Sequence, residues 1–409
     1  MIQIKNVCTP ENKRKNIVIE SDQNIIIDAE HLLVFPGLID PHVHFRTPGL
    51  EYKENWTTAA KASIKGGYTT VFDMPNTLPP TITKEALIEK KALIDKQLKA
   101  IGIPLRYHLF FGADKHHLHE IKKVNDKVIG IKVFMGCSTG GLVIDDEESL
   151  HAIFKLAAKE NMLVAVHAED EVRLKENRKK FRDVQSYSIH SEIRDESAAI
   201  IAVKKAIQLV RLYKTRLYIL HVSTRQEIDL IAQAKEEGLP IFAETTPHHL
   251  FLNVNDYPDL AGKAIMNPPL RSSEHQRALF SAIKLGIIET IGSDHAPHTQ
   301  EEKAKPYGLC PSGVPGIETA LPLLLEAYHQ DLITLTDIVN LTSYRAKKIF
   351  HLTQCHDDYV LVDLSLGKKV QEKYLSTKCQ WSPFRGRFLR GWPVITILKG
   401  RIYDLSKMT

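Results

Sequence analysis

The sequence predicts an α/β protein, a (β/α)8 barrel with a small all-β domain formed by the N- and C-terminal segments. Between residues 36 and 354, short runs of β-branched and other apolar residues alternate with longer segments of helical composition. Both ends of the chain instead contain only short alternating strands. Barrels of this kind contain ~200 to more than 400 residues, and this chain has 409. A doubly wound open sheet is the competing architecture.

Eight strands, most of them followed by a helix, are predicted in order along the chain. The strands are Leu33–His44, Tyr68–Met74, Leu105–Gly112, Val128–Phe134, Leu163–His167, Leu217–His221, Ile241–Thr245 and Ile287–Ser293. The helices are Trp56–Lys65, Lys84–Lys99, Glu147–Lys159, Glu196–Leu212, Gln226–Glu237, Glu274–Leu285 and Glu318–Tyr328. Glycines such as Gly66, Gly238 and Gly286 follow helices, where they favour helix termination.

The ends of the chain predict a separate composite domain, made of residues 1–35 and 355–409. Its predicted strands are Gln3–Val7, Ile17–Glu20, Asn24–Asp28 and the segments 358–363 and 393–404. Neither end is long enough to bury a core alone. We therefore expect the two ends to pair beside a catalytic barrel of residues 36–354.

Composition limits the classes of partner. The chain is 43% hydrophobic and 25% charged, as in ordinary globular proteins, and its net charge is +5. That surplus is too small to predict nucleic acid or a membrane surface as partner. The five cysteines show no paired spacing, and no signal peptide or membrane-spanning run of ~20 apolar residues is present. These features predict a cytoplasmic protein, and they are compatible with a homodimer.

Histidines, a lysine and an aspartate stand where predicted strands end, which is where barrel enzymes carry their chemistry. His42 and His44 are two residues apart, so both would project from one face of a strand toward one metal ion. That pair alone also fits a chance spacing or a hydrogen-bonding role. The other strand-end residues are Lys132, His167, His221 and Asp294. Their agreement across separate strands favours a shared metal centre.

Imidazole and carboxylate groups are suitable ligands for zinc, and two zinc ions ~3.5–4 Å apart can share a hydroxide and polarise a carbonyl oxygen. A charged Lys132 would be unfavourable beside two dications, whereas a neutral amine can add CO₂ and become an anionic bridging carbamate. From the residues alone, a structural or salt-bridged Lys132 is an equal alternative.

Three further segments receive other interpretations. The segment from Lys115 to His119 opens a charged stretch away from any strand end, so a surface position is expected. His248 and His249 are adjacent, so their side chains diverge, and supporting or structural roles are expected. Gly308–Gly316 is interpreted as a lid, with a plain surface loop as the alternative.

Several motifs resemble the amidohydrolase superfamily and, within it, the dihydroorotase family. The segment PHVHFRTPG at 41–49 is similar to the family's HVHFREPG stretch, with Thr47 where glutamate is usual, and DMPNT at 73–77 matches its MPNT segment. Further matches follow in family order: HAE at 167–169, HVS at 221–223, ETTPHH at 244–249, NPPLR at 267–271, DHAPH at 294–298 and SPFRG at 382–386. The segment KVFMG at 132–136 resembles the branch with a carbamylated lysine, whereas another branch uses an aspartate near that place.

The resemblance implies the reversible cyclisation of N-carbamoyl-L-aspartate to L-dihydroorotate, a step of pyrimidine biosynthesis. It implies a first zinc ion on His42 and His44, a second on His167 and His221, and carbamylated Lys132 and a hydroxide as bridges. Asp294 would complete the first site and transfer the catalytic proton.

The same motifs assign the substrate contacts. Arg46 would grip the substrate carboxylate in a bidentate pair, Asn76 and His298 would add hydrogen bonds, and Asn267 would contact the polar edge of the ring. Two alternatives remain: another cyclic amidohydrolase of the hydantoinase, dihydropyrimidinase or allantoinase type, and a noncatalytic scaffold.

Overall fold

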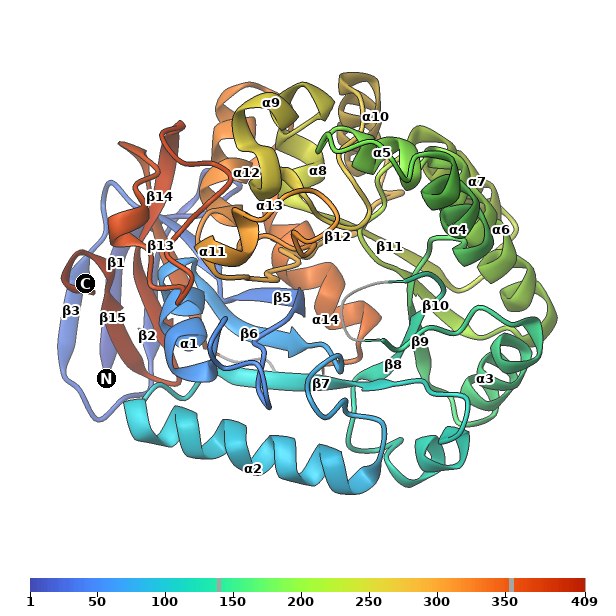
Figure 1. Cartoon of the computed structure of the whole chain (residues 1–409). Coiled ribbons are helices and arrows are strands. Elements are labelled where there is room, and N and C mark those ends of the chain that lie inside the picture. Colours follow the sequence, from blue (N-terminus) through green and yellow to red (C-terminus); the bar gives the residue numbers. More distant parts are fainter. Residues whose placement is uncertain (138–140, 353–356, 409) are drawn as a thin grey trace.

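The computed structural model describes residues 1–137, 141–352 and 357–408, and it contains the expected barrel (Figure 1). Eight parallel strands hydrogen-bond in the order of the sequence. They are β5 (Leu38–Val43), β6 (Tyr68–Asp73), β7 (Arg106–Gly112), β8 (Gly130–Phe134), β9 (Leu163–His167), β10 (Arg216–Ile219), β11 (Ile241–Thr245) and β12 (Thr290–Ile291). A parallel bridge between Val43 and His295 joins the first and last strands. This sequential order excludes the doubly wound sheet, in which the strand order reverses.

The predicted helices are present and follow their strands. They are α1 (Trp56–Lys65), α2 (Lys84–Ile101), α3 (Glu147–Lys159), α6 (Glu196–Tyr213), α7 (Arg225–Glu236), α10 (Ser273–Lys284) and α12 (Ala320–His329). Side-chain caps fix several starts, as where Thr224 and Glu227 form a reciprocal capping box at α7. The helix predicted from Glu318 begins at Ala320, and the Glu318 side chain accepts hydrogen bonds from the N–H groups of residues 376 and 377.

Short helices that the sequence pattern did not predict fill the connections. They are α4 (Glu171–Lys180), α5 (Ile189–Ile193), α8 (Pro247–Phe251), α9 (Tyr257–Leu260), α11 (Gln300–Lys303), α13 (Leu335–Val339) and α14 (Arg345–Ile349), with the 3₁₀ helices η1 (Leu118–Lys123), η2 (Val254–Asp256), η3 (Ala261–Ala264), η5 (Glu372–Tyr374) and η6 (Leu405–Lys407) and the π-helix η4 (Asn340–Tyr344). Several of them follow the carboxyl ends of barrel strands, so they surround the barrel mouth.

The two ends of the chain form a separate seven-stranded sheet, as expected. Its strands are β1 (Ile2–Cys8), β2 (Arg14–Ile19), β3 (Ile25–Asp28), β4 (Leu33–Pro36), β13 (Tyr359–Lys369), β14 (Phe388–Leu398) and β15 (Arg401–Asp404). The order is β15-β14-β13-β4-β1-β2, with β3 also paired to β1. N- and C-terminal strands meet where β4 pairs with β13.

The prediction of one strand over Leu33–His44 was wrong. The segment is two strands, with β4 in the terminal sheet and β5 in the barrel. Gly37 separates them at a point where a Cβ would lie 2.3 Å from Thr69 Oγ1. The expected division at 35/36 falls inside β4, and the one at 354/355 lies outside the described residues, so the domain bounds remain a prediction.

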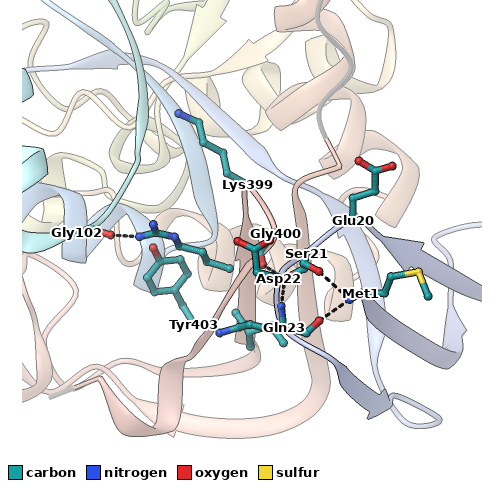
Figure 2. A pocket seen from close by; sticks show the side chains of 11 residues that line it. Met1, Glu20, Ser21, Asp22, Gln23, Gly102, Lys399, Gly400 and Tyr403 are labelled. Atoms are coloured by element: carbon teal, nitrogen blue, oxygen red, sulfur yellow. Dashed lines mark hydrogen bonds between the residues drawn. The ribbon is translucent and has the colours of Figure 1, made fainter.

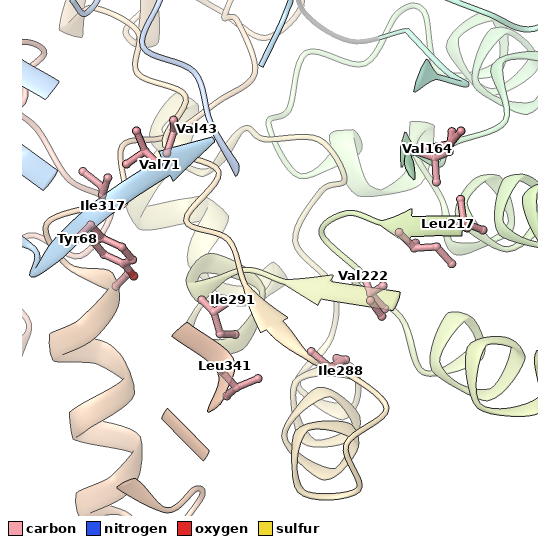
Figure 3. Packing of buried hydrophobic residues seen from close by; sticks show 14 of the residues in the cluster. Val43, Tyr68, Val71, Val164, Leu217, Val222, Ile288, Ile291, Ile317 and Leu341 are labelled. Atoms are coloured by element: carbon pink, nitrogen blue, oxygen red, sulfur yellow. The ribbon is translucent and has the colours of Figure 1, made fainter. Parts of the chain in front are cut away.

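Two apolar layers position the site. Outward-facing side chains such as Val71, Val164 and Leu217 pack beneath the helices (Figure 3). Inside the barrel, Phe350 contacts Phe72 at 4.8 Å and Tyr218 at 5.0 Å between ring centroids. Because these rings come from β6 and β10, Phe350 closes the barrel interior below the polar residues of its mouth.

Candidate metal and substrate site

The residues predicted as metal ligands gather at the carboxyl ends of barrel strands, and each is buried. His42 lies in β5, Lys132 in β8 and His167 in β9. His44, His221 and Asp294 follow β5, β10 and β12 by one to three residues. His167 follows Ala165 by two residues. Because side chains alternate between the two faces of a strand, both lie on the face of β9 that forms the apolar interior, which explains why His167 is buried.

His42, His44 and Asp294 form a three-sided group. Their potential ligand atoms lie within 4.8 Å of one another, and no other such group is found in the part of the chain that the structure describes. Asp294 Oδ1 is 3.3 Å from His42 Nε2 and 3.2 Å from His44 Nε2. The other nitrogen of each ring is engaged, because His42 Nδ1 is 2.8 Å from Glu244 Oε1 and His44 Nδ1 is 2.8 Å from Asn76 Oδ1.

This arrangement suits a cation. Burial lowers the pKa of His42 to about 3 and of His44 to about 4, so both rings are neutral near pH 7. When Nδ1 donates to Glu244 or Asn76, each Nε2 presents a lone pair toward the Asp294 carboxylate. Three acceptors that converge without a shared proton repel one another, and a metal ion between them removes that repulsion. The outer partners would also fix the rings, as in other histidine metal sites.

His167 and His221 form a second group. His167 Nδ1 is 2.9 Å from His221 Nε2, and a tetrahedral zinc ion with Zn–N bonds of ~2.0–2.1 Å would hold two nitrogens about 3.3 Å apart. His167 Nε2 lies 2.8 Å from Glu169 Oε2, whose carboxylate accepts bonds from the buried Arg194. The rings of His42 and His221 have centroids 5.4 Å apart, so the two groups are adjacent.

Lys132 forms no ion pair with any residue that the structure describes. It is 1% exposed, its Nζ lies 4.7 Å from the centroid of the Phe134 ring, and no carboxylate of the described residues is within 4.0 Å of it. Burial lowers its pKa to about 7. Its charge in turn lowers the pKa values of His42, His167 and His221, which places the amine near both histidine groups. The salt-bridged alternative finds no support here.

Three residues of the candidate site have strained backbone, and the buried Asp40 helps to hold the strand ends in place. Arg46, His221 and Asp294 have φ angles of 62°, 41° and 44°, a region that non-glycine residues adopt at a cost of about 1–3 kcal/mol each. Asp40 accepts hydrogen bonds from the backbone N–H groups of His42 at 3.2 Å and Ser293 at 3.0 Å. Asp40 therefore ties the ends of β5 and β12 together, a role that the sequence analysis missed.

A small pocket opens beside the first histidine group. Its lining residues are His44, Arg46, Asn76, Asn267, Asp294, Ala296, Ser312 and Gly313. Its empty volume, including the open mouth, is about 290 Å³. Three of the four predicted substrate-binding residues thus share one cavity with two predicted metal ligands.

Arg46 is a buried cation that forms no ion pair with the described residues. It is 2% exposed, its Nε donates to the Pro297 carbonyl at 3.1 Å, and no described carboxylate lies within 4.0 Å of its guanidinium group. Burial lowers its pKa to about 10, which leaves it charged near neutral pH. An unpaired buried charge is unfavourable, so this group is suited to bind an anion in the pocket.

His298, the fourth predicted substrate residue, stands behind Arg46 and does not line the pocket. Its Nδ1 is 3.0 Å from Lys53 Nζ, and its Nε2 is 3.0 Å from the Ser312 carbonyl and 3.3 Å from Arg46 Nη2. Lys53 in turn pairs with Glu302 at 3.0 Å. Direct contact of His298 with substrate therefore remains a prediction, and Lys53 and Glu302 are neighbours that the sequence analysis missed.

The remaining histidine-containing segments lie outside the two histidine groups, and their surroundings differ from one another. The segment from Lys115 to His119 lies at the surface, as expected, and the side chain of His119 is 66% exposed. His249 is buried and engaged by Thr246 and the Pro268 carbonyl. His248 is also buried, and its Nε2 lacks a hydrogen-bond partner among the described residues. The lid interpretation of Gly308–Gly316 stays a prediction, although Gly316 N donates to His295 Nδ1.

A wider hollow lies elsewhere on the surface, at the edge of the terminal sheet (Figure 2). It is open to solvent and has an empty volume of about 1680 Å³. Its lining includes Met1, whose ammonium group donates to the carbonyls of Ser21 and Gln23. It contains none of the histidines described above, so the smaller pocket at the barrel mouth is the candidate site.

Comparison with known proteins defines the class. The Amidohydrolase family matches residues 33–355, and the chain belongs to that family. Among curated relatives, a dihydroorotase of Methanosphaera stadtmanae is 34% identical, with 98% of this chain and 95% of the relative covered. A dihydroorotase of Methanosarcina acetivorans is also 34% identical, over 93% of this chain and 84% of the relative.

Among solved structures, the L-hydantoinase (dihydropyrimidinase) of Arthrobacter aurescens superposes with a TM-score of 0.92 at 26% identity, over 98% of this chain and 96% of that chain. The dihydropyrimidinase of Brevibacillus agri gives 0.86 at 27% identity, over 98% and 94%. These similarities define a cyclic amide hydrolase. No helix of the described residues is long and apolar enough to cross a membrane.

Proposed function

We propose that this protein is a dihydroorotase, which interconverts N-carbamoyl-L-aspartate and L-dihydroorotate in pyrimidine biosynthesis. One observation carries the proposal: the buried Arg46 has no counterion among the described residues and lines a pocket shared with His44 and Asp294. The carboxylate of dihydroorotate would supply that counterion in a bidentate pair. The unsubstituted hydantoin and dihydropyrimidine rings carry no carboxylate for this position.

The side chains present fit two metal ions. His42, His44 and Asp294 would hold one and His167 and His221 the second, with Lys132 as a bridging carbamate formed from its amine and CO₂ with release of a proton. Two bound zinc ions would polarise the scissile carbonyl and lower the pKa of the attacking water. The converging lone pairs of the first group and the short His167–His221 contact support this assignment.

Side chains of the protein would carry out proton transfer and substrate binding. Asp294 would accept the proton of the attacking water and pass it to the departing ring nitrogen, because its carboxylate lines the pocket. Arg46 would hold the substrate carboxylate, and Asn76, fixed by His44 Nδ1, would add a hydrogen bond. Orientation by these groups brings the scissile bond next to the histidines.

A hydantoinase-type activity is the second candidate, and the structural similarity to the Arthrobacter aurescens enzyme favours it. The decisive experiment assays protein of measured zinc content in both directions with dihydroorotate and carbamoyl aspartate, and in parallel with hydantoin, dihydrouracil and allantoin. Turnover confined to the carboxylated pair is expected. Turnover of an uncarboxylated ring without turnover of dihydroorotate would overturn the proposal, and folded zinc-loaded protein without any activity would favour the scaffold.

A further inference from the structure

His190 connects a short inserted helix to the pocket. It lies in α5, in the connection between β9 and α6, and is 6% exposed. Its Nε2 is 3.0 Å from both the Met266 carbonyl oxygen and Asn267 Oδ1. Its Nδ1 is 3.2 Å from the hydroxyl of Tyr307, which stands just before the Gly308–Gly316 segment.

These contacts determine where the protons lie. The Met266 carbonyl can only accept a hydrogen bond, so Nε2 of His190 must carry a hydrogen. The atom of Asn267 that faces the same nitrogen must then also be an acceptor, which is the amide oxygen and not the amide nitrogen. Burial keeps the ring neutral by lowering its pKa to about 3, so the Tyr307 hydroxyl donates to Nδ1.

Because the Asn267 oxygen accepts from His190, the Asn267 NH₂ group can donate a hydrogen bond into the pocket that this residue lines. Among the described residues, no hydrogen bond from this nitrogen is found, and the contact of Asn267 with His190 is made by its Oδ1. We infer that His190 is a positioning residue that turns the Asn267 amide so that the pocket presents a hydrogen-bond donor to the substrate. The site then selects ligands with an acceptor, such as a ring carbonyl or a carboxylate oxygen, at that point.

The same helix supports the second histidine group. Arg194, four residues after His190, binds Glu169 with its guanidinium group, and Glu169 contacts His167. The Arg194 backbone N–H also donates to the His190 carbonyl at 3.0 Å. One inserted turn therefore orients a substrate-facing amide and a metal-facing imidazole together.

A double-mutant cycle tests the role of His190, which rests on the proposed function. With dihydroorotate, His190→Ala is expected to raise KM roughly two- to tenfold, the effect of one misdirected hydrogen bond, with a smaller change in kcat. His190→Gln retains an N–H donor near the Nε2 position and is expected to restore KM. In an Asn267→Ala background, His190→Ala should change KM no further, because its effect passes through Asn267.

Controls separate this effect from a loss of folding. Tyr307→Phe removes only the donor to Nδ1 and should give a weaker increase of KM that also disappears with Asn267→Ala. His151→Ala removes a ring of α3 that contacts the Tyr213 hydroxyl and should leave KM unchanged. Independent, additive effects of His190→Ala and Asn267→Ala, or no effect of either His190→Ala or Tyr307→Phe on KM, would overturn the inference. If wild-type protein lacks dihydroorotase activity, the proposed function fails separately, and the cycle is measured with the ring that it does hydrolyse.

Discussion

In the proposed function, Arg46 is the side chain on which the specificity for a carboxylated substrate depends. Arg46→Ala is expected to raise KM for dihydroorotate by roughly 10- to 100-fold, because a charge-assisted hydrogen bond contributes ~1.5–3 kcal/mol. Arg46→Lys should recover only part of this loss, since an ammonium group cannot form the bidentate pair. Steady-state kinetics of the three proteins measures the effect. An unchanged KM in Arg46→Ala would remove the carboxylate clamp from the proposal.

Lys132 is buried and forms no ion pair with the described residues, so in the proposed function its loss should act mainly through the metals. Lys132→Ala is expected to lose bound zinc and activity, and a short carboxylic acid in solution should restore part of both by replacing the carbamate. Metal analysis and activity with and without the acid measure this. Lys61→Ala, at an exposed position of α1, is the control. Full turnover in Lys132→Ala without added acid would exclude the bridge.

Asp294 combines ligation with proton transfer in the proposed mechanism. Asp294→Asn keeps the size and one oxygen, so part of the zinc should remain bound. Turnover should fall by roughly 100-fold or more, because positioned general acid–base groups contribute 10²–10⁴-fold. Zinc content and kcat are measured on the same preparation. A near-normal kcat would assign the proton transfer to another group.

At the scale of elements, the rule that barrel enzymes carry their chemistry at strand ends predicted where most residues of the candidate site lie, and the inserted segments explain what was missed. His42, His167 and Asp294 end strands whose pattern is visible in the sequence. Lys53 stands in a polar loop 245 residues from His298, and Glu244 lies 202 residues from His42. No local sequence pattern predicts a contact between residues so far apart along the chain. His190 lies in a five-residue helix too short to give a periodic signal.

Gly37 lies at the junction between β4 of the terminal sheet and β5 of the barrel. Gly37→Ala is expected to destabilise the protein by ~1–3 kcal/mol, the cost of overpacking, since the new Cβ would lie 2.3 Å from Thr69 Oγ1 and 2.7 Å from Asp358 Cβ. Denaturant unfolding measures the free energy of unfolding. Gly102→Ala has no neighbour within 4 Å and tests only the cost of a φ of 67°, about 1–2 kcal/mol. Equal stability of Gly37→Ala and wild type would contradict this account of the junction.

At the scale of the whole molecule, buried carboxylates of the barrel hold the C-terminal segment. Glu54, just before α1, accepts from the Thr377 hydroxyl at 2.6 Å and the Lys378 N–H at 3.1 Å, and it faces His295 beside the site. Glu318 accepts from the N–H groups of Ser376 and Thr377. The segment between β13 and β14 is thus tied to the residues that close the barrel mouth. The sequence could not predict this contact, because it joins two residues that are 323 positions apart.

These two acids predict opposite responses of stability to pH. Burial alone would raise the pKa of Glu54, but hydrogen bonds from His295, Thr377 and Thr58 outweigh it and lower the pKa. Because the folded pKa lies below the unfolded value, the charged form stabilises the fold above the unfolded pKa, and this contribution disappears as pH falls through the folded pKa. Glu54→Gln should therefore lower stability most at neutral pH, with the difference from wild type shrinking toward pH 4 and below.

For Glu318, burial raises the pKa, so its contribution has the opposite sign. The protonated form is favoured in the fold, and stability from this group falls as pH rises from the unfolded toward the folded pKa. Relative to wild type, Glu318→Gln should therefore fare better at neutral than at acidic pH, whereas Glu54→Gln should fare worse. Denaturant unfolding of the three proteins between pH 4 and 7 measures both differences. Parallel pH curves for the two variants would contradict this account, because a lowered pKa of Glu54 and a raised pKa of Glu318 make the two curves diverge.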